Sequence, residues 1–162
     1  MITTKLISGG VLAAAVASCV IAAPSASAAE GQEVTTQSGR VRCWVTATGS
    51  FPPLTPPDGV GGYVICEAGK PTSDGSLGGF ESAPMFEDPP LHMTNATVDA
   101  AGNFSFLMAN MGQVSENQLT LSYGQTYNIQ GWTILSGPDG TRFTNNATGH
   151  GMFVSIENTY AF

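Results

Sequence analysis

The sequence predicts an all-β protein, a single antiparallel β-sandwich, with a small β-barrel as the alternative. Beyond residue 28, apolar residues do not recur with the helical period of about 3.6 residues over any useful length. Roughly seven or eight short segments instead alternate apolar and polar residues, and turn residues separate them. Cys43 and Cys66 lie within two of these segments. A bridge between neighbouring strands or facing sheets favours the sandwich over the barrel.

Residues 1–28 have the order of a secretory signal peptide. A single positive charge precedes an apolar, Ala-rich run over residues 6–23, and residues 26–28 (Ala-Ser-Ala) give the small-x-small pattern of a cleavage site. We therefore expect cleavage after Ala28 and a secreted protein with one β-domain over residues 29–162.

A lipoprotein is the alternative product of the same leader. Residues 16–19 can be interpreted as a lipobox, with cleavage before Cys19 and acylation of its thiol. The apolar run continues past Cys19, which favours the soluble form. Nothing after residue 28 approaches the about twenty apolar residues that span a bilayer, so we expect no transmembrane segment in the mature chain.

The charge balance limits the partners of the mature protein. Removal of the leader leaves four basic side chains against the chain's twelve acidic ones. So few cations cannot displace the counterions of a phosphate backbone, which argues against nucleic acid and against an anionic membrane surface. The expected partner is an unidentified protein or a component of the cell envelope.

Cys43 and Cys66 are predicted to form a disulfide. The strands expected over residues 41–47 and 60–67 alternate in phase with inward valines, and each places its cysteine on the inward face. Export to an oxidising compartment favours a bridge over two thiols. Redox catalysis would need a Cys-x-x-Cys spacing or a lone activated thiol, and the sequence has neither.

The remaining elements follow in chain order. Residues 68–91, rich in Gly, Pro, Ser and Asp, form an irregular stretch longer than most loops of a compact domain. Residues 93–98 and 104–109 read as a hairpin around an Asp-Ala-Ala-Gly-Asn turn.

The second half of the mature chain shows the clearest alternation. Residues 119–123 and 126–135 are expected to form another hairpin around Gly-Gln. Within 126–135 the bulky residues change from odd to even positions near Gly131, which predicts a β-bulge. A strand over residues 141–145 and a final strand over 151–162 complete the domain.

Four segments of this half carry a resemblance to a known group of proteins. Together with the Ala-rich leader they resemble small exported proteins of actinobacteria, of mycobacterial type; the segments are residues 123–127, 131–134, 140–145 and 148–152. The likeness covers about the last forty residues and the leader. It implies a secreted or cell-envelope β-protein of unknown function, and it transfers no functional residue.

Residues suited to catalysis are few. Histidine is the side chain best suited to acid–base chemistry near neutral pH, and the chain has two, His92 and His150. His150 lies between two glycines and is the candidate polar site. Glu87 and Asp88, with Glu81 nearby, could supply a glycosidase pair, although an acidic pair beside Pro-Pro usually lies in a solvated loop. No nucleophile or metal motif is present, so we expect no catalytic residue, no metal and no cofactor.

The sequence therefore favours a non-catalytic binding protein. Its expected binding loop is residues 68–91, with the apolar side chains Phe80, Met85, Phe86 and Leu91 as anchors. Trp44, Phe51 and Tyr63 add aromatic surface beyond what a short core needs. The alternative for these side chains is that they simply belong to the core. The alternative functions are a carrier of a small apolar ligand and a small extracellular hydrolase.

Overall fold

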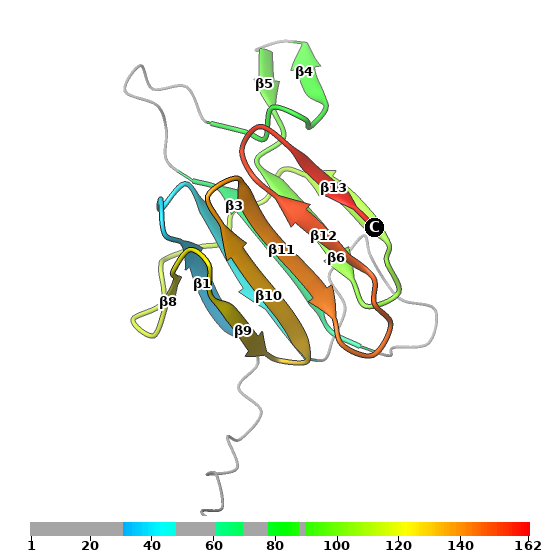
Figure 1. Ribbon diagram of the computed structural model, residues 1–162. Coiled ribbons are helices and arrows are strands. Elements are labelled where there is room, and N and C mark those ends of the chain that lie inside the picture. Colours follow the sequence, from blue (N-terminus) through cyan, green and yellow to red (C-terminus); the bar gives the residue numbers. More distant parts are fainter. Residues whose placement is uncertain (1–30, 48–60, 70–77, 88–89) are drawn as a thin grey trace, which may run out of the picture.

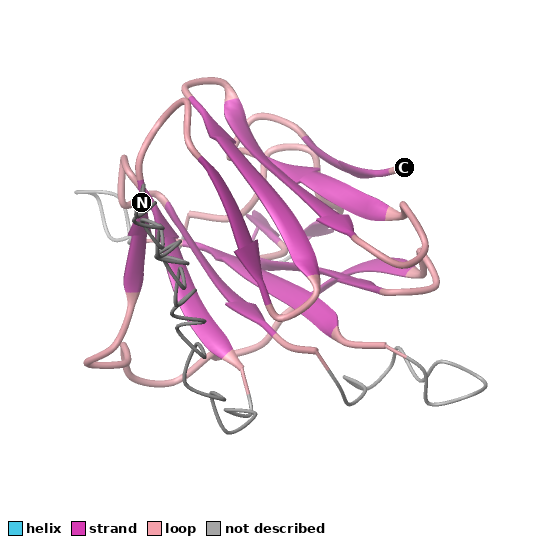
Figure 2. Ribbon diagram, turned by 60° about the horizontal axis from the view of Figure 1, so that its bottom comes forward, coloured by secondary structure: helices cyan, strands magenta, loops and turns pink. Residues whose placement is uncertain are grey.

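The structure is a computed structural model that describes residues 31–47, 61–69, 78–87 and 90–162. In these ranges the chain forms strands, turns and loops and no helix, which confirms the all-β prediction (Figure 2). The predicted signal peptide, the lipobox at Cys19 and the aromatic residue Phe51 lie outside the described residues.

The described strands form two sheets that pack as a sandwich and do not close into a barrel (Figure 1). The six-stranded sheet has the order β7-β6-β3-β2-β1-β8 and the five-stranded sheet the order β13-β12-β11-β10-β9. All pairings are antiparallel except that of β1 with β8. The six-stranded sheet contains β1 (Gln32–Thr36), β2 (Val41–Val45), β3 (Tyr63–Ala68), β6 (Asn95–Asp99), β7 (Phe104–Leu107) and β8 (Leu119–Leu121). The five-stranded sheet contains β9 (Thr126–Ile129), β10 (Trp132–Gly137), β11 (Gly140–Asn145), β12 (Gly151–Val154) and β13 (Thr159–Ala161).

A separate two-stranded hairpin stands at one end of the sandwich. It consists of β4 (Met85–Glu87) and β5 (Pro90–His92), and it lies at the top of Figure 1. Part of the stretch over residues 68–91, which the sequence predicts to be irregular, therefore forms a short antiparallel strand pair.

The core lies between the two sheets, because every second residue of their strands points inward. The largest of these side chains are fully buried: Val34, Val45, Val64, Val98, Trp132, Ile134, Phe143, Met152 and Val154. Each such burial contributes about 1.5–3 kcal/mol of transfer free energy. The indole Nε1 of Trp132 also donates a hydrogen bond of 3.0 Å to the carbonyl of Thr46, which ties one sheet to the other.

The predicted disulfide between Cys43 and Cys66 is confirmed. The two residues are direct cross-strand partners on β2 and β3, and both side chains point into the core. The predicted hairpin around residues 99–103 is also present as β6 and β7. Its turn is closed by Asp99 Oδ1, which accepts hydrogen bonds of 2.9 Å from the backbone N–H groups of Ala101 and Asn103.

The predicted bulge at Gly131 is wrong. The chain reverses there, and β9 pairs with β10 through a two-residue turn in which Gln130 and Gly131 both have positive φ, 51° and 80°. Ile129 and Trp132 then lie opposite each other and share the inner face. A two-residue turn changes the parity of the apolar positions just as a bulge does, so alternation cannot separate the two.

Two further strand assignments are corrected by the observed pairing. Residues 119–123 do not form a hairpin with the segment that follows, because β8 pairs in parallel with β1. β1 itself was not predicted from the sequence. The segment 151–162 is two strands, β12 and β13, reversed by a turn in which the Ser155 N–H donates to the Asn158 carbonyl (2.9 Å).

Candidate functional site

A segment that crosses the outer face of the six-stranded sheet shapes the candidate site. β7 and β8 lie at opposite edges of this sheet, so residues 108–118 between them cross one of its faces. The Ala109 N–H donates to Asn95 Oδ1 (2.9 Å), and Arg42 Nη1 donates to the Gly112 carbonyl (3.1 Å). The side chains of Asn95 and Arg42 alternate with inward residues of their strands, so they point to the outer face of the sheet. The segment that bonds to them therefore crosses the outer face. We call residues 108–118 the strap.

A charge cluster beneath the strap fastens it to the sheet. Arg42 Nη2 lies 2.5 Å from Glu67 Oε2, and Arg42 Nη1 lies 3.5 Å from Glu33 Oε1. Glu33, whose side chain is 5% exposed, also accepts hydrogen bonds from the Ser115 backbone N–H (2.7 Å) and from Gln118 Nε2 (2.8 Å). A buried carboxylate is tolerated when it is both paired and hydrogen-bonded, as this one is. We therefore assign the cluster a structural role.

An open cleft of about 370 Å³ lies beside the strap on the same face. Its floor consists of Trp44, Tyr63 and Ile65, which are outward side chains of β2 and β3. Trp44 and Ile65 are direct cross-strand partners, and Tyr63 lies two residues away on the same face. The other lining residues come from β1 and the strap: Glu33, Ala109, Asn110, Met111, Gln113 and Ser115. The cleft thus combines an aromatic floor with polar groups around it.

The inner face of the sheet sets the geometry of this floor. The disulfide partners Cys43 and Cys66 are the immediate neighbours of Trp44 and Ile65, so a covalent bond fixes the register of the two strands that carry the floor. Burial raises the pKa of Tyr63 above its ordinary value of 10.0, so the phenol, which is protonated at physiological pH even without this shift, can donate a hydrogen bond in the cleft.

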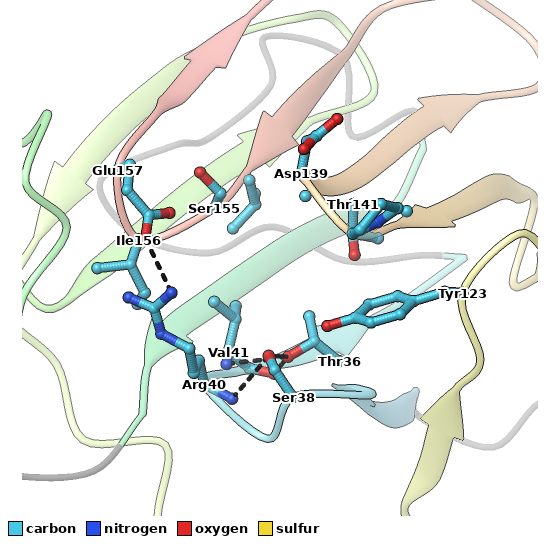
Figure 3. Close-up of a pocket in the computed structure, with 14 residues that line it drawn as sticks. Thr36, Ser38, Arg40, Val41, Tyr123, Asp139, Thr141, Ser155, Ile156 and Glu157 are labelled. Atoms are coloured by element: carbon cyan, nitrogen blue, oxygen red, sulfur yellow. Dashed lines mark hydrogen bonds and ion pairs between the residues drawn. The ribbon is translucent and has the colours of Figure 1, made fainter.

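Two other hollows are less suited to an organic ligand. One, of about 630 Å³, lies on the far side of the strap over Arg42 and Glu67, and no aromatic side chain is among its described lining residues. The other, of about 50 Å³, lies at an end of the sandwich where the Arg40–Glu157 ion pair of 2.8 Å forms one side (Figure 3). A water molecule occupies about 30 Å³ of liquid, so this space suits one or two waters.

The structure separates the four apolar residues predicted for the binding loop. Phe80 is 0% exposed and belongs to the core, where its ring centroid lies 6.3 Å from that of Phe106. Met85 on β4 is 57% exposed, and Leu91 on β5 is half-buried. Phe86 pairs with Leu91 in the β4–β5 ladder, and its side chain lies outside the description. Phe80 is therefore not available on the surface, whereas Met85 is.

The histidines are not brought together with acidic groups in the described ranges. His150 is exposed after β11, with its ring against Gly102, and His92 Nδ1 lies 3.0 Å from the Ala83 carbonyl. The same ranges contain no group of three or more His, Cys, Asp or Glu side chains that could hold a metal ion. They also contain no helix with the length and hydropathy needed to cross a bilayer.

Glu33 and the strap were missed by the sequence analysis, whereas Trp44 and Tyr63 were noticed as surplus aromatic surface. Gln32–Thr36 has one apolar side chain, Val34, so it gives little alternation signal. The strap is held by contacts with residues far away in the chain, which no local pattern reveals.

Comparison with known proteins identifies no relative. No protein-family model, no curated protein and no solved structure matches this chain. The resemblance to exported actinobacterial proteins therefore stays a prediction, and the function has to be argued from the site.

Proposed function

We propose that the chain is an exported, non-catalytic binding protein that holds a small ligand in the cleft over Trp44 and Tyr63. The cleft itself carries the proposal, because it places half-buried aromatic side chains on the sheet face opposite the core. Its volume of about 370 Å³ falls in the range of small-molecule sites, which are largely apolar with a few polar groups. This function combines the binding protein and the ligand carrier that the sequence left open.

The charges around the cleft favour a neutral ligand. The Glu33 carboxylate at its edge is already engaged by Arg42, Ser115 and Gln118. Arg42 lies between Glu33 and Glu67, so an anionic ligand would gain little from it. An aromatic floor with amide groups beside it suits a ligand that has one apolar face and hydroxyl or amide groups on its edge.

Two observations support export. Residues 1–28 have the pattern of a secretory signal, and the Cys43–Cys66 disulfide is compatible with an extracellular location. A small domain with an open amphipathic cleft would then meet its ligand outside the cytoplasm.

Titration with the neutral fluorescent dye Nile red tests the site. We expect saturable binding by the wild-type protein and an affinity about tenfold lower for Trp44→Ala, because the indole supplies most of the apolar floor; tenfold corresponds to about 1.4 kcal/mol. Circular dichroism checks that the variant folds. The emission of Trp132, which is buried in the core, serves as an internal reference.

Met85→Ser is the matched control. Met85 is an exposed apolar residue of the β4–β5 hairpin and does not line the cleft, so its replacement should leave dye affinity unchanged. If Met85→Ser lost binding while Trp44→Ala kept it, the ligand site would belong to the predicted loop 68–91 and the cleft assignment would be wrong.

A further inference from the structure

The strap supplies the cleft with hydrogen-bonding groups that the protein itself leaves unused. Asn110, Gln113 and Ser115 of the strap line the cleft. Asn110 Oδ1 accepts a hydrogen bond of 2.7 Å from the Gly112 N–H, and Ser115 Oγ accepts one of 3.2 Å from the Asn117 N–H. These bonds occupy acceptors only, so the Asn110 amide and the Ser115 hydroxyl can still donate. The Gln113 side chain is exposed and forms no hydrogen bond within the described ranges, so it can both donate and accept.

The floor beneath these groups is an aromatic and aliphatic surface that extends over two strands. Trp44 lies opposite Ile65, and Tyr63 is two residues from Ile65 on the same face. Trp44 and Tyr63 are therefore diagonal neighbours, about 7–8 Å apart. An aromatic ring carries partial negative charge on its faces, which attracts C–H groups of the opposite partial charge. The floor thus favours a flat ring with C–H groups on one side.

The described lining of the cleft offers no unpaired charge to a ligand. Glu33 is the only charged side chain among these residues, and its carboxylate is already engaged by the ion pair and the hydrogen bonds of the cluster beneath the strap. A phosphate or carboxylate ligand would therefore gain no ion pair there. A purely apolar ligand would displace water from the strap amides and leave them without partners, which lowers affinity. The unused groups suit a neutral ligand rich in hydroxyls.

We propose that the ligand of this cleft is a neutral carbohydrate, a short stretch of a chain of pyranose rings. A pyranose ring presents C–H groups on one face and hydroxyls, which both donate and accept, around its edge. With that face on Trp44 and Tyr63, the hydroxyl edge meets the polar groups of the strap that flanks the floor. The open side of the cleft lets the chain continue into solvent. This inference rests on the proposed function, because it names the class of ligand that the same cleft holds.

Displacement of Nile red by sugars tests the class of ligand. Three neutral hexasaccharides of different linkage (cellohexaose, maltohexaose and mannohexaose) are added to the dye complex of the mature wild-type protein up to about 20 mM, well above the dissociation constant of a weak millimolar complex. We expect at least one of them to displace the dye with saturation, and calorimetry measures its affinity directly. Sorbitol at the same hydroxyl concentration should not displace the dye, because it has the hydroxyls but no ring face.

Two strap variants separate sugar binding from dye binding. Asn110→Ala and Gln113→Ala should each lower the affinity for the displacing sugar about fivefold, as the loss of one hydrogen bond predicts, and leave Nile red affinity unchanged. Trp44→Ala should weaken both. Asn117→Ala is the matched control, since Asn117 is an exposed amide of the strap that does not line the cleft. Circular dichroism of each variant checks its fold.

The outcomes distinguish this inference from the proposed function. If Nile red binds through Trp44 and no hexasaccharide displaces it, the carbohydrate inference is overturned and the ligand site stands. If neither the dye nor a sugar binds, both fail. A sugar affinity that is the same in the wild type, Asn110→Ala and Gln113→Ala also overturns the inference, because the strap would then not contact the hydroxyl edge.

Discussion

The outer faces of the two sheets differ in what covers them. The strap crosses the six-stranded sheet and is held there by a buried charge cluster, with an amphipathic cleft beside it. On the five-stranded sheet the chain leaves Leu135 and Tyr160 about half exposed in a row across the strands. A covered face with a hollow can enclose a small molecule, whereas an uncovered row of side chains encloses no space.

The disulfide should have the largest effect, and it belongs to the strapped sheet. Replacing Cys43 and Cys66 together by Ala should lower the free energy of unfolding by about 3 kcal/mol, as loop closure predicts for a bridge of this span. The strands should remain, because their core valines are unchanged. Urea unfolding followed by circular dichroism measures both. A loss below about 1 kcal/mol would mean that the strap and core already fix β2 against β3.

Removing the carboxylate beneath the strap should have the next largest effect. Glu33→Ala should cost about 2 kcal/mol, because it leaves half-buried donors of the strap without an acceptor. Glu116→Ala, the same change at an exposed strap position, should stay within about 0.5 kcal/mol of the wild type. Equal values for the two variants in urea unfolding would contradict a strap held by Glu33.

The alternation of inward and outward residues explains which features of the fold could be predicted from the sequence. Inward residues such as Val41, Cys43 and Val45 alternate with outward ones, so the strands, the sandwich and the disulfide partners follow from a local pattern. The alternation did not reveal that the chain reverses at Gly131, because a two-residue turn and a bulge shift the pattern equally.

Alternation also predicted part of the candidate site. Trp44 and Tyr63 stand out because large aromatic side chains occupy outward positions. The cleft over them depends on a polar segment that bonds to Glu33 and Asn95, about 82 and 14 residues away in the chain, and composition does not encode such contacts. For Phe80 the sequence left both a surface and a core position open, because its neighbours are turn residues, and its ring packs in the core.

The smallest expected effect on stability comes from the exposed ion pair between Arg40 and Glu157 at the end of the sandwich. This pair differs from the charge cluster beneath the strap, which is buried. The pKa of Glu157 is lowered from its ordinary value of 4.5, chiefly because its carboxylate accepts a hydrogen bond from its own backbone N–H and then because of the hydrogen bond from Arg40. A carboxyl whose pKa is lower in the folded state adds stability above its unfolded pKa and loses it as the pH falls through the folded value. Both side chains are about half exposed, so solvent screens the pair and its contribution should be a few tenths of a kcal/mol.

Arg40→Ala therefore separates the two causes. We expect the pKa of Glu157 to rise but to stay below its ordinary value, because the backbone hydrogen bond remains. Carboxyl titration by NMR measures this change, and urea unfolding at neutral and acidic pH should show a small loss of stability above pH 4.5 that disappears at lower pH. A loss as large as that of Glu33→Ala would mean that the exposed pair fastens the sandwich end as firmly as the buried cluster fastens the strap. Solvent screening argues against that outcome, so the two ion pairs should rank by burial.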